Sequence, residues 1–172
     1  KKPELLLPAG SLNRLKTAFL YGADAVYAGM PGVCLRNKIS FTAEEMKQGI
    51  DYAHSIGKKV YLTVNLFTHN KDIERVENFI TLLKDLNPDG VIVADPGVFA
   101  RIQEEIPTLP LHISTQANVC SAEVCKLYHE LNYENIKIVF SGRKENLRQD
   151  VLEAMEYITE KTKNNTKGTF NI

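Results

Sequence analysis

The sequence predicts an α/β fold in which short parallel strands alternate with helices. Three observations predict it: the apolar runs are short and do not alternate with polar residues, helical periodicity separates them, and a polar turn with an acidic residue recurs before a strand. Runs without alternation are typical of parallel strands that are covered on both faces. Repeated strand–helix units of roughly 20–35 residues give a parallel sheet with right-handed crossovers.

Six runs rich in Val, Ile, Leu and Tyr are the predicted strands. They are Glu4–Leu7, Ala25–Ala28, Lys59–Val64, Gly90–Ala94, Leu111–Ser114 and Ile136–Phe140. The acidic turn residue occupies the same place in three units, at Asp24, Asp89 and Glu134. This weak internal repeat supports a chain built from similar strand–helix units.

Helices are predicted between the strands, and several have recognisable start signals. The first runs from about Leu12 to Tyr21 with Ser11 as its cap, and Thr42-x-x-Glu45 is a capping box for the second. Pro at the first helical position, after Asp95, starts the fourth. The remaining helices are marked by apolar residues at helical spacing: Ile73, Val76, Ile80 and Leu83, then Val124, Leu127, Tyr128 and Leu131, and finally the helix from about Glu145 to Lys161.

Two architectures fit six such units: a (β/α) TIM-type barrel that is incomplete, or an open doubly wound sheet. A complete barrel needs eight units and about 250 residues, whereas this chain has 172. We expect residues 1–160 to form a single domain and residues 161–172 to be a polar tail. An incomplete barrel would leave its first and sixth strands as open edges, which favours a homodimer through those edges.

The composition argues against some classes of protein. Lys+Arg and Asp+Glu number 21 each, so the chain lacks the basic surplus of a large nucleic-acid footprint, although a local basic patch remains compatible. No apolar run approaches the roughly 18 residues of a membrane span, and no signal peptide is visible. The three cysteines, Cys34, Cys120 and Cys125, are expected to be reduced thiols of a cytoplasmic protein.

Polar residues follow most of the predicted strands. Alternating α/β folds place their active sites at the carboxyl ends of the strands, so we expect these residues to share one pocket. They are Gly10, Ser11, Arg36, Asn65 and Asp95, with His112, Ser114, Thr115, Gln116 and Asn118 in or after the fifth strand. An alternative stays open, in which Asp95 and Ser11 cap helices while Asn65 and Asn118 satisfy backbone groups of loops.

Signatures of a nucleophile or of a metal site are mostly missing. There is no G-x-S-x-G elbow, Gly10-Ser11 lacks the spaced glycines of a phosphate loop, and His129-Glu130 lacks the second His of a zinc protease motif. Cys34 is a candidate nucleophile because the nearby Arg36 would lower the pKa of its thiol. The alternative is that Cys34 is a small packing residue. No metal ligands are predicted.

Six blocks stand in order from the first predicted strand to the residues that follow the fifth. They are Glu4–Ser11 (ELLLPAGS), Gly22–Tyr27 (GADAVY), Leu35–Arg36, Tyr61–Asn65 (YLTVN), Asp95–Gly97 and His112–Asn118 (HISTQAN). Together they resemble the collagenase-like peptidase family, the U-thirty-two peptidases. The resemblance implies a barrel-type catalytic domain, so it favours the incomplete barrel, and it implies that this chain is the N-terminal part of a longer family domain.

The first activity that the resemblance implies is proteolysis. Arg36 and Asn65 would then orient the substrate, since Arg suits recognition of carboxylate or phosphate, and Asp95 would be the acid or base. The other polar residues would bind a peptide substrate: Gly10, Ser11, His112, Ser114, Thr115, Gln116 and Asn118. The cofactor is unknown, with a divalent metal as one option for a peptidase.

Two alternatives accompany the peptidase. Other family members take part in oxygen-independent hydroxylation of an RNA base or of an aromatic ring, so the substrate stays undecided between a peptide and an RNA or small molecule. Those members hold an iron–sulfur cluster on cysteines beyond the sixth strand, and this chain has no recognisable counterparts there. The other alternative is a non-catalytic barrel fragment that binds a partner or dimerises.

Overall fold

The computed structural model of the chain describes residues 4–34, 41–66, 68–130 and 136–138. Six strands and five α-helices alternate along this part of the chain. The strands are β1 (Leu6–Ala9), β2 (Ala25–Gly29), β3 (Lys59–Val64), β4 (Gly90–Val93), β5 (Leu111–Ile113) and β6 (Ile136–Ile138). The helices are α1 (Leu12–Leu20), α2 (Ala43–Ser55), α3 (Ile73–Leu86), α4 (Pro96–Glu105) and α5 (Ala122–Glu130), with short 3₁₀ helices η1 (Asn70–Asp72) and η2 (Thr115–Ala117).

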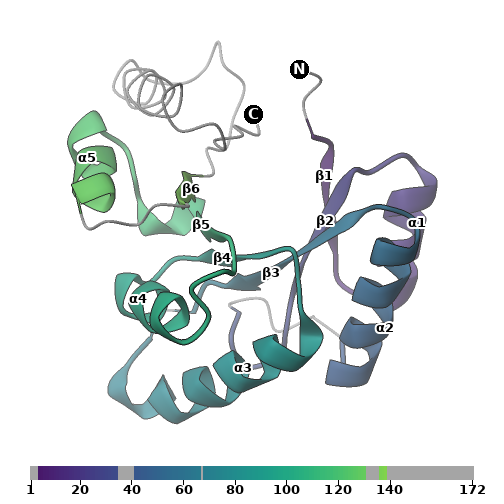
Figure 1. Cartoon of the computed structure of the whole chain (residues 1–172), viewed down its shortest axis with the longest axis horizontal. Coiled ribbons are helices and arrows are strands. Elements are labelled where there is room, and N and C mark those ends of the chain that lie inside the picture. The colour runs from purple at the N-terminus through teal and green to yellow at the C-terminus, as the bar shows by residue number, and fades with distance from the viewer. Residues whose placement is uncertain (1–3, 35–40, 67, 131–135, 139–172) are drawn as a thin grey trace.

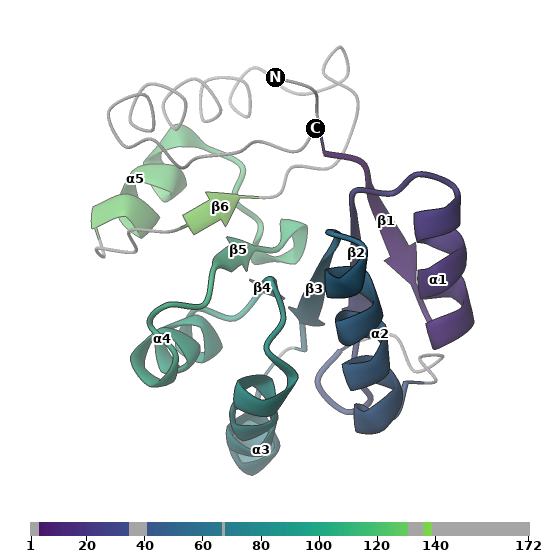
Figure 2. The same cartoon turned by 45° about the vertical axis from the view of Figure 1, so that its right-hand side comes forward.

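The strand order distinguishes between the two predicted architectures. All six strands are parallel and lie in the order of the sequence, from β1 to β6. An open doubly wound sheet reverses its strand order at a switch point, and the described sheet has no such reversal. The helices lie around the outer side of the curved sheet (Figures 1 and 2). The fold is therefore an incomplete TIM-type barrel, as the resemblance implied.

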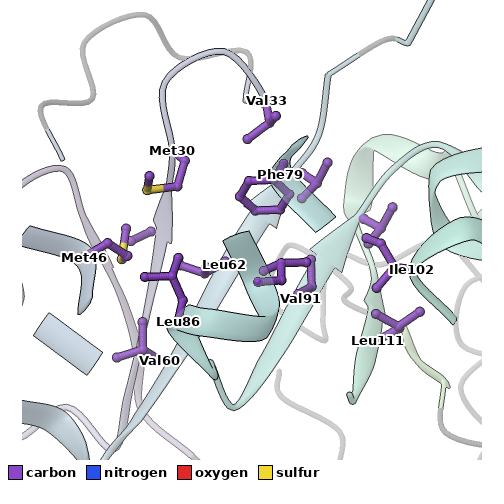
Figure 3. Packing of buried hydrophobic residues seen from close by; sticks show 14 of the residues in the cluster. Met30, Val33, Met46, Val60, Leu62, Phe79, Leu86, Val91, Ile102 and Leu111 are labelled. Carbon is purple, nitrogen blue, oxygen red and sulfur yellow. The ribbon is translucent and has the colours of Figure 1, made fainter. Parts of the chain in front are cut away.

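The main hydrophobic core lies between the strands and the surrounding helices. Alternate strand residues such as Val60, Leu62 and Val91 pack there against helix residues such as Met46 and Phe79 (Figure 3). The other face of the sheet is also apolar, because Ala25, Tyr61 and Ile92 form a second cluster with Leu6 and Tyr27. Both faces carry buried apolar residues, which is why the sequence of the strands does not alternate.

The predicted strand boundaries agree closely with the structure except at β1. The third strand begins and ends where predicted, whereas β1 spans Leu6–Ala9 rather than Glu4–Leu7 and contains Pro8. Proline lacks a backbone N–H and is tolerated in a strand mainly at the edge of a sheet. In the described sheet, β1 pairs only with β2. Proline at position 8 therefore costs no hydrogen bond to a second neighbouring strand.

Several predicted features lie outside the described residues. They are Arg36, the acidic turn residue Glu134, the end of the sixth predicted strand, the helix from Glu145 to Lys161 and the polar tail, residues 161–172. Among the helices that the structure describes, none is both long enough and apolar enough to cross a membrane.

Two acidic turn residues, Asp24 and Asp89, bond to the backbone of the preceding strand or of the residue just before it. An Asp24 carboxylate oxygen accepts from the backbone N–H of Leu5 at 3.0 Å. In the same way, Asp89 accepts from the N–H of Val60 in β3 at 2.8 Å, and His54 Nε2 lies 3.0 Å from the same oxygen. At the two turns that the structure describes, the repeated acid is therefore an acceptor that ties the turn to the backbone of the preceding unit.

Replacing Asp89 by alanine is expected to lower the free energy of unfolding by about 1–3 kcal/mol, because the Val60 N–H loses a charged acceptor in a half-buried place. Urea unfolding measures the change. Asp85→Ala is a matched control, since Asp85 is exposed on α3 and its loss is expected to cost less than about 0.5 kcal/mol. Equal losses in the two variants would contradict a special role for the turn.

Candidate functional site

The topology brings five of the predicted site positions to one edge of the sheet. Because the strands are parallel, the residues that follow β1, β3, β4 and β5 all lie at the carboxyl edge. These residues are Gly10, Ser11, Asn65, Asp95 and Ser114. Arg36 lies outside the described residues, so its predicted role in a shared pocket with Asp95 stays a prediction.

Register and alternation place two of these polar residues in one row. Thr63, Ile92 and His112 are register partners across β3, β4 and β5. Asn65 and Ser114 stand two residues further along, and residues of a strand two apart share a face. The ladder continues to this level, because the N–H of Ser114 donates to the carbonyl of Val93 at 2.8 Å. Asn65 and Ser114 therefore occupy the carboxyl end of the inner face of the sheet, the face that carries Tyr61 and Ile92.

Three of the predicted site residues cap helices. An Asp95 carboxylate oxygen accepts from the N–H of Val98 at 3.0 Å, at the start of α4. The hydroxyl of Ser11 accepts from the N–H of Arg14 in the same position of α1, and that of Ser114 accepts from Gln116 at the start of η2. The capping alternative for Asp95 and Ser11 is thus confirmed in the structure, and a role in chemistry would be additional to it.

Two substitutions, Asp95→Asn and Asp95→Ala, distinguish a role of Asp95 as a helix cap from a role as an acid or base. Asp95→Asn keeps a capping oxygen, so we expect it to leave unfolding almost unchanged, whereas Asp95→Ala is expected to cost about 1 kcal/mol. Thermal or urea unfolding measures both variants. A fall in activity in Asp95→Asn without a fall in stability would show that the carboxylate also takes part in the reaction.

The residues after β5 form an exposed polar segment. Thr115 and Gln116 are exposed in η2, and Asn118 follows in a left-handed backbone conformation at φ 55°. Asparagine tolerates this conformation better than most residues. Its side-chain oxygen accepts from the Cys120 thiol at 3.1 Å, so the segment presents amide, hydroxyl and thiol groups to solvent near the carboxyl edge.

His112 lies apart from this exposed segment. Its side chain is buried, and its ring centroid is 4.7 Å from that of Tyr61 on the inner face. A Cβ atom at Gly90 would lie 3.0 Å from His112 Nε2, so the imidazole extends over Gly90. Gly90 is the register partner of Tyr61, whereas the register partner of His112 is Ile92. Gly90 thus lies two residues closer to the amino end of β4 than Ile92. The ring therefore leans toward the amino ends of the strands, away from the polar edge.

An arginine links two loops at the same edge. Arg75, in the first turn of α3, donates to the carbonyl of Gly32 at 3.2 Å and lies 3.4 Å from the carboxylate of buried Asp72. Gly32 has φ +86°, and a Cβ there would lie 3.1 Å from Arg75 Cδ. The loop after β2 is thus held against the start of α3. No local pattern in the sequence marks Arg75, Tyr61 or Gly90 as part of the site, because each acts through a contact distant in sequence.

The described residues do not form a metal or cluster site. No group of three or more His, Cys, Asp or Glu side chains among them is arranged to hold a metal ion. Cys34 and Cys125 are buried, Cys120 is exposed, and all three are free thiols. They do not fit the iron–sulfur cluster that the family resemblance implies.

Thiol labelling is expected to distinguish the three cysteines. Burial raises the pKa of the Cys125 thiol to about 11, so it stays protonated and unreactive near neutral pH, since the thiolate is the nucleophile. Cys120 is expected to react first in the folded chain, and Cys34 and Cys125 only after unfolding. Mass spectrometry of peptides after alkylation at pH 8 measures the order, and rapid labelling of Cys125 would contradict it.

A model of the family described as Peptidase family U32 matches residues 10–150. The chain belongs to peptidase family U32. The match confirms the resemblance drawn from the six sequence blocks, most of which lie within it.

Two curated relatives are named for RNA hydroxylation. This U32 chain is 44% identical over 135 residues to the tRNA hydroxylation protein P of Helicobacter pylori, an alignment that covers 77% of the chain and 32% of that protein. It is 32% identical over 159 residues to the 23S rRNA 5-hydroxycytidine C2501 synthase of Escherichia coli, covering 92% of the chain and 23% of that protein. The chain thus spans about a third or less of the length of these relatives.

Among solved structures, the fold is similar to that of the U32 peptidase Mk0906. The TM-score is 0.69 at 17% sequence identity, and the similarity covers 91% of this chain and 65% of that one. At this identity the similarity concerns the fold alone, and it agrees with the barrel-type arrangement of β1 to β6.

Proposed function

We propose that this chain is the front part of a barrel domain that takes part in hydroxylating a base of RNA. The single observation that carries the proposal is the similarity to two proteins named for RNA hydroxylation, one acting on tRNA and one on 23S rRNA. The activity of the whole protein would require the regions of the domain that this chain does not contain, since the alignments cover only 32% and 23% of the two relatives.

The geometry of the carboxyl edge supports a site for a polar, planar substrate. Asn65 and Ser114 lie in one row at the carboxyl end of the inner face, on either side of β4, and the amide of Asn118 lies in the segment after β5. Amide and hydroxyl groups can donate to and accept from the edge of a nucleobase. We propose that these residues, with Thr115 and Gln116, contact the base, and that Asn65 orients it.

Positive charge near this edge supports contact with the RNA backbone. The Arg14 guanidinium lies near Gly10 at the carboxyl end of β1, because Arg14 Nη1 would be 3.5 Å from a Cβ there. Arg75 lies at the loop after β2. The formal net charge of the chain is zero, so phosphate contact would depend on such local groups rather than on a general basic surface.

The peptidase activity predicted first from the sequence has less support. Cys125 is buried with a raised pKa, and the hydroxyls of Ser11 and Ser114 accept from backbone N–H groups at helix starts. A peptidase of the nucleophilic type needs a side chain activated by a neighbouring base, whereas the hydroxyls of Ser11 and Ser114 serve as helix caps. The hydroxylation proposal therefore takes precedence.

Nucleoside analysis tests the proposal. RNA from the source organism is compared between a strain that carries the complete gene and a deletion strain, with tRNA and rRNA digested separately and analysed by mass spectrometry. We expect the deletion to remove a nucleoside that is heavier than its parent by one oxygen atom, and the complete gene to restore it. Unchanged nucleosides in both RNA classes, together with cleavage of gelatin or casein by the purified full-length protein, would replace the proposal with the peptidase.

A further inference from the structure

Tyr61 and His112 form an aromatic pair in the interior of the sheet, on its inner face. Their ring centroids are 4.7 Å apart with the planes tilted by 48°. The two side chains are only 2% and 3% exposed. Tilted aromatic pairs at this separation are favourable beyond the area that they bury, so the pair has a preferred arrangement.

Gly90 makes the space that the pair occupies. Any side chain there would begin 3.0 Å from His112 Nε2, 3.2 Å from Tyr61 Cδ1 and 2.9 Å from the carbonyl oxygen of Pro110. The third contact is with backbone, which cannot turn aside like the end of a flexible side chain. A methyl group at position 90 would therefore displace the imidazole, the phenol ring or both.

The hydroxyl end of Tyr61 is held in place by Glu4. Its hydroxyl donates to a carboxylate oxygen of Glu4 at 3.0 Å, and Lys59 Nζ lies 3.8 Å from the same oxygen. Burial, together with the charge of Glu4, raises the pKa of the phenol above its ordinary range. The hydroxyl consequently keeps the proton that it donates, and the ring is fixed at both of its ends, by Glu4 and by His112.

We propose that Tyr61 and Gly90 are positioning residues that hold the His112 imidazole beneath Ser114, and that His112 supports the site as a fixed aromatic side chain rather than by transferring a proton. The position of the ring carries this inference, because it is buried and leans away from the carboxyl edge. The inference rests on the proposed function for its effect on activity, but not for its effect on structure.

The structural part is tested by NMR without any substrate. In the full-length protein, cross-relaxation between the ring protons of His112 and Tyr61 is expected, and Tyr61→Phe is expected to retain it because the ring remains. Gly90→Ala is expected to weaken or remove it while the chain stays folded. Absence of this cross-relaxation in the folded unsubstituted protein would overturn the proposal, whatever the reaction of the protein proves to be.

The functional part is tested by RNA hydroxylation in deletion strains that carry variants. His112→Phe is expected to retain activity within about threefold, since it keeps a ring of similar volume, and the pH profile of the purified enzyme is expected to be unchanged. His112→Ala, Tyr61→Leu and Gly90→Ala are each expected to lose about tenfold or more through misplacement of the site. The double variant Tyr61→Leu/His112→Ala is expected to be no worse than His112→Ala alone.

The outcomes distinguish the two proposals. If His112→Phe is as inactive as His112→Ala, or loses one limb of the pH profile, the imidazole transfers a proton and the inference is wrong. If the unsubstituted gene restores no hydroxylated nucleoside, the proposed function fails, and the NMR contact alone then decides whether Tyr61 and Gly90 position His112.

Discussion

Replacing Phe99 by alanine is expected to lower the free energy of unfolding by about 3–5 kcal/mol, the usual range for a buried phenylalanine. Phe99 lies in α4 and is 2% exposed, within the core between the sheet and the helices. The substitution leaves a cavity that surrounding side chains fill only in part. Urea unfolding followed by circular dichroism measures the loss.

Leu20→Ala is the matched control for Phe99. Leu20 is 79% exposed at the end of α1, so we expect its truncation to change stability by less than about 0.5 kcal/mol. A loss below about 1 kcal/mol for Phe99→Ala would mean that α4 does not pack on the sheet as described, because core truncations of this size cost more.

The largest expected effect on activity belongs to Asn65. On the proposed function, Asn65→Ala is expected to lower the amount of hydroxylated nucleoside by about tenfold to a hundredfold, because loss of an orienting group misplaces the reacting atoms. The residue lies at the carboxyl end of the inner face of β3, in the same row across the sheet as Ser114 after β5, with β4 between them. Mass spectrometry of RNA from complemented deletion strains measures the effect.

Asn78→Ala provides the control for the same chemical change on α3, where Asn78 is exposed. We expect it to match the unsubstituted gene. Comparable protein levels for both variants, measured by immunoblot, separate a site effect from loss of folded protein. Full activity of Asn65→Ala would remove Asn65 from the site and leave the segment after β5 as the candidate.

Much of the fold could be predicted because local signals agreed with it. The capping box of Thr42 and Glu45 and the Pro96 start of α4 are present as predicted. The choice between barrel and open sheet could not come from periodicity, since both are built from the same strand–helix units. It depends on the order in which the strands pair, which is a contact between distant parts of the chain.

The site was predicted in position more than in detail. Parallel strands oblige Asn65, Asp95 and Ser114 to share an edge, so that part followed from the topology. Strand alternation predicts the face on which His112 lies. It does not predict that the ring points toward the amino ends of the strands, because this depends on the space that Gly90 leaves. The bond from Arg75 to the loop after β2 spans 43 residues, and no local pattern in the sequence marks it.

The bonds from Asp24 and Asp89 have a consequence for how the sheet assembles. Each carboxylate accepts from a backbone N–H of the preceding unit, at Leu5 just before β1 and at Val60 in β3. Each new strand can therefore find its neighbour already in place, and a slip by one residue would break the bond as well as exchange the two faces. Because every strand of the described sheet pairs with the one before it in sequence, the sheet can grow unit by unit in the order of synthesis.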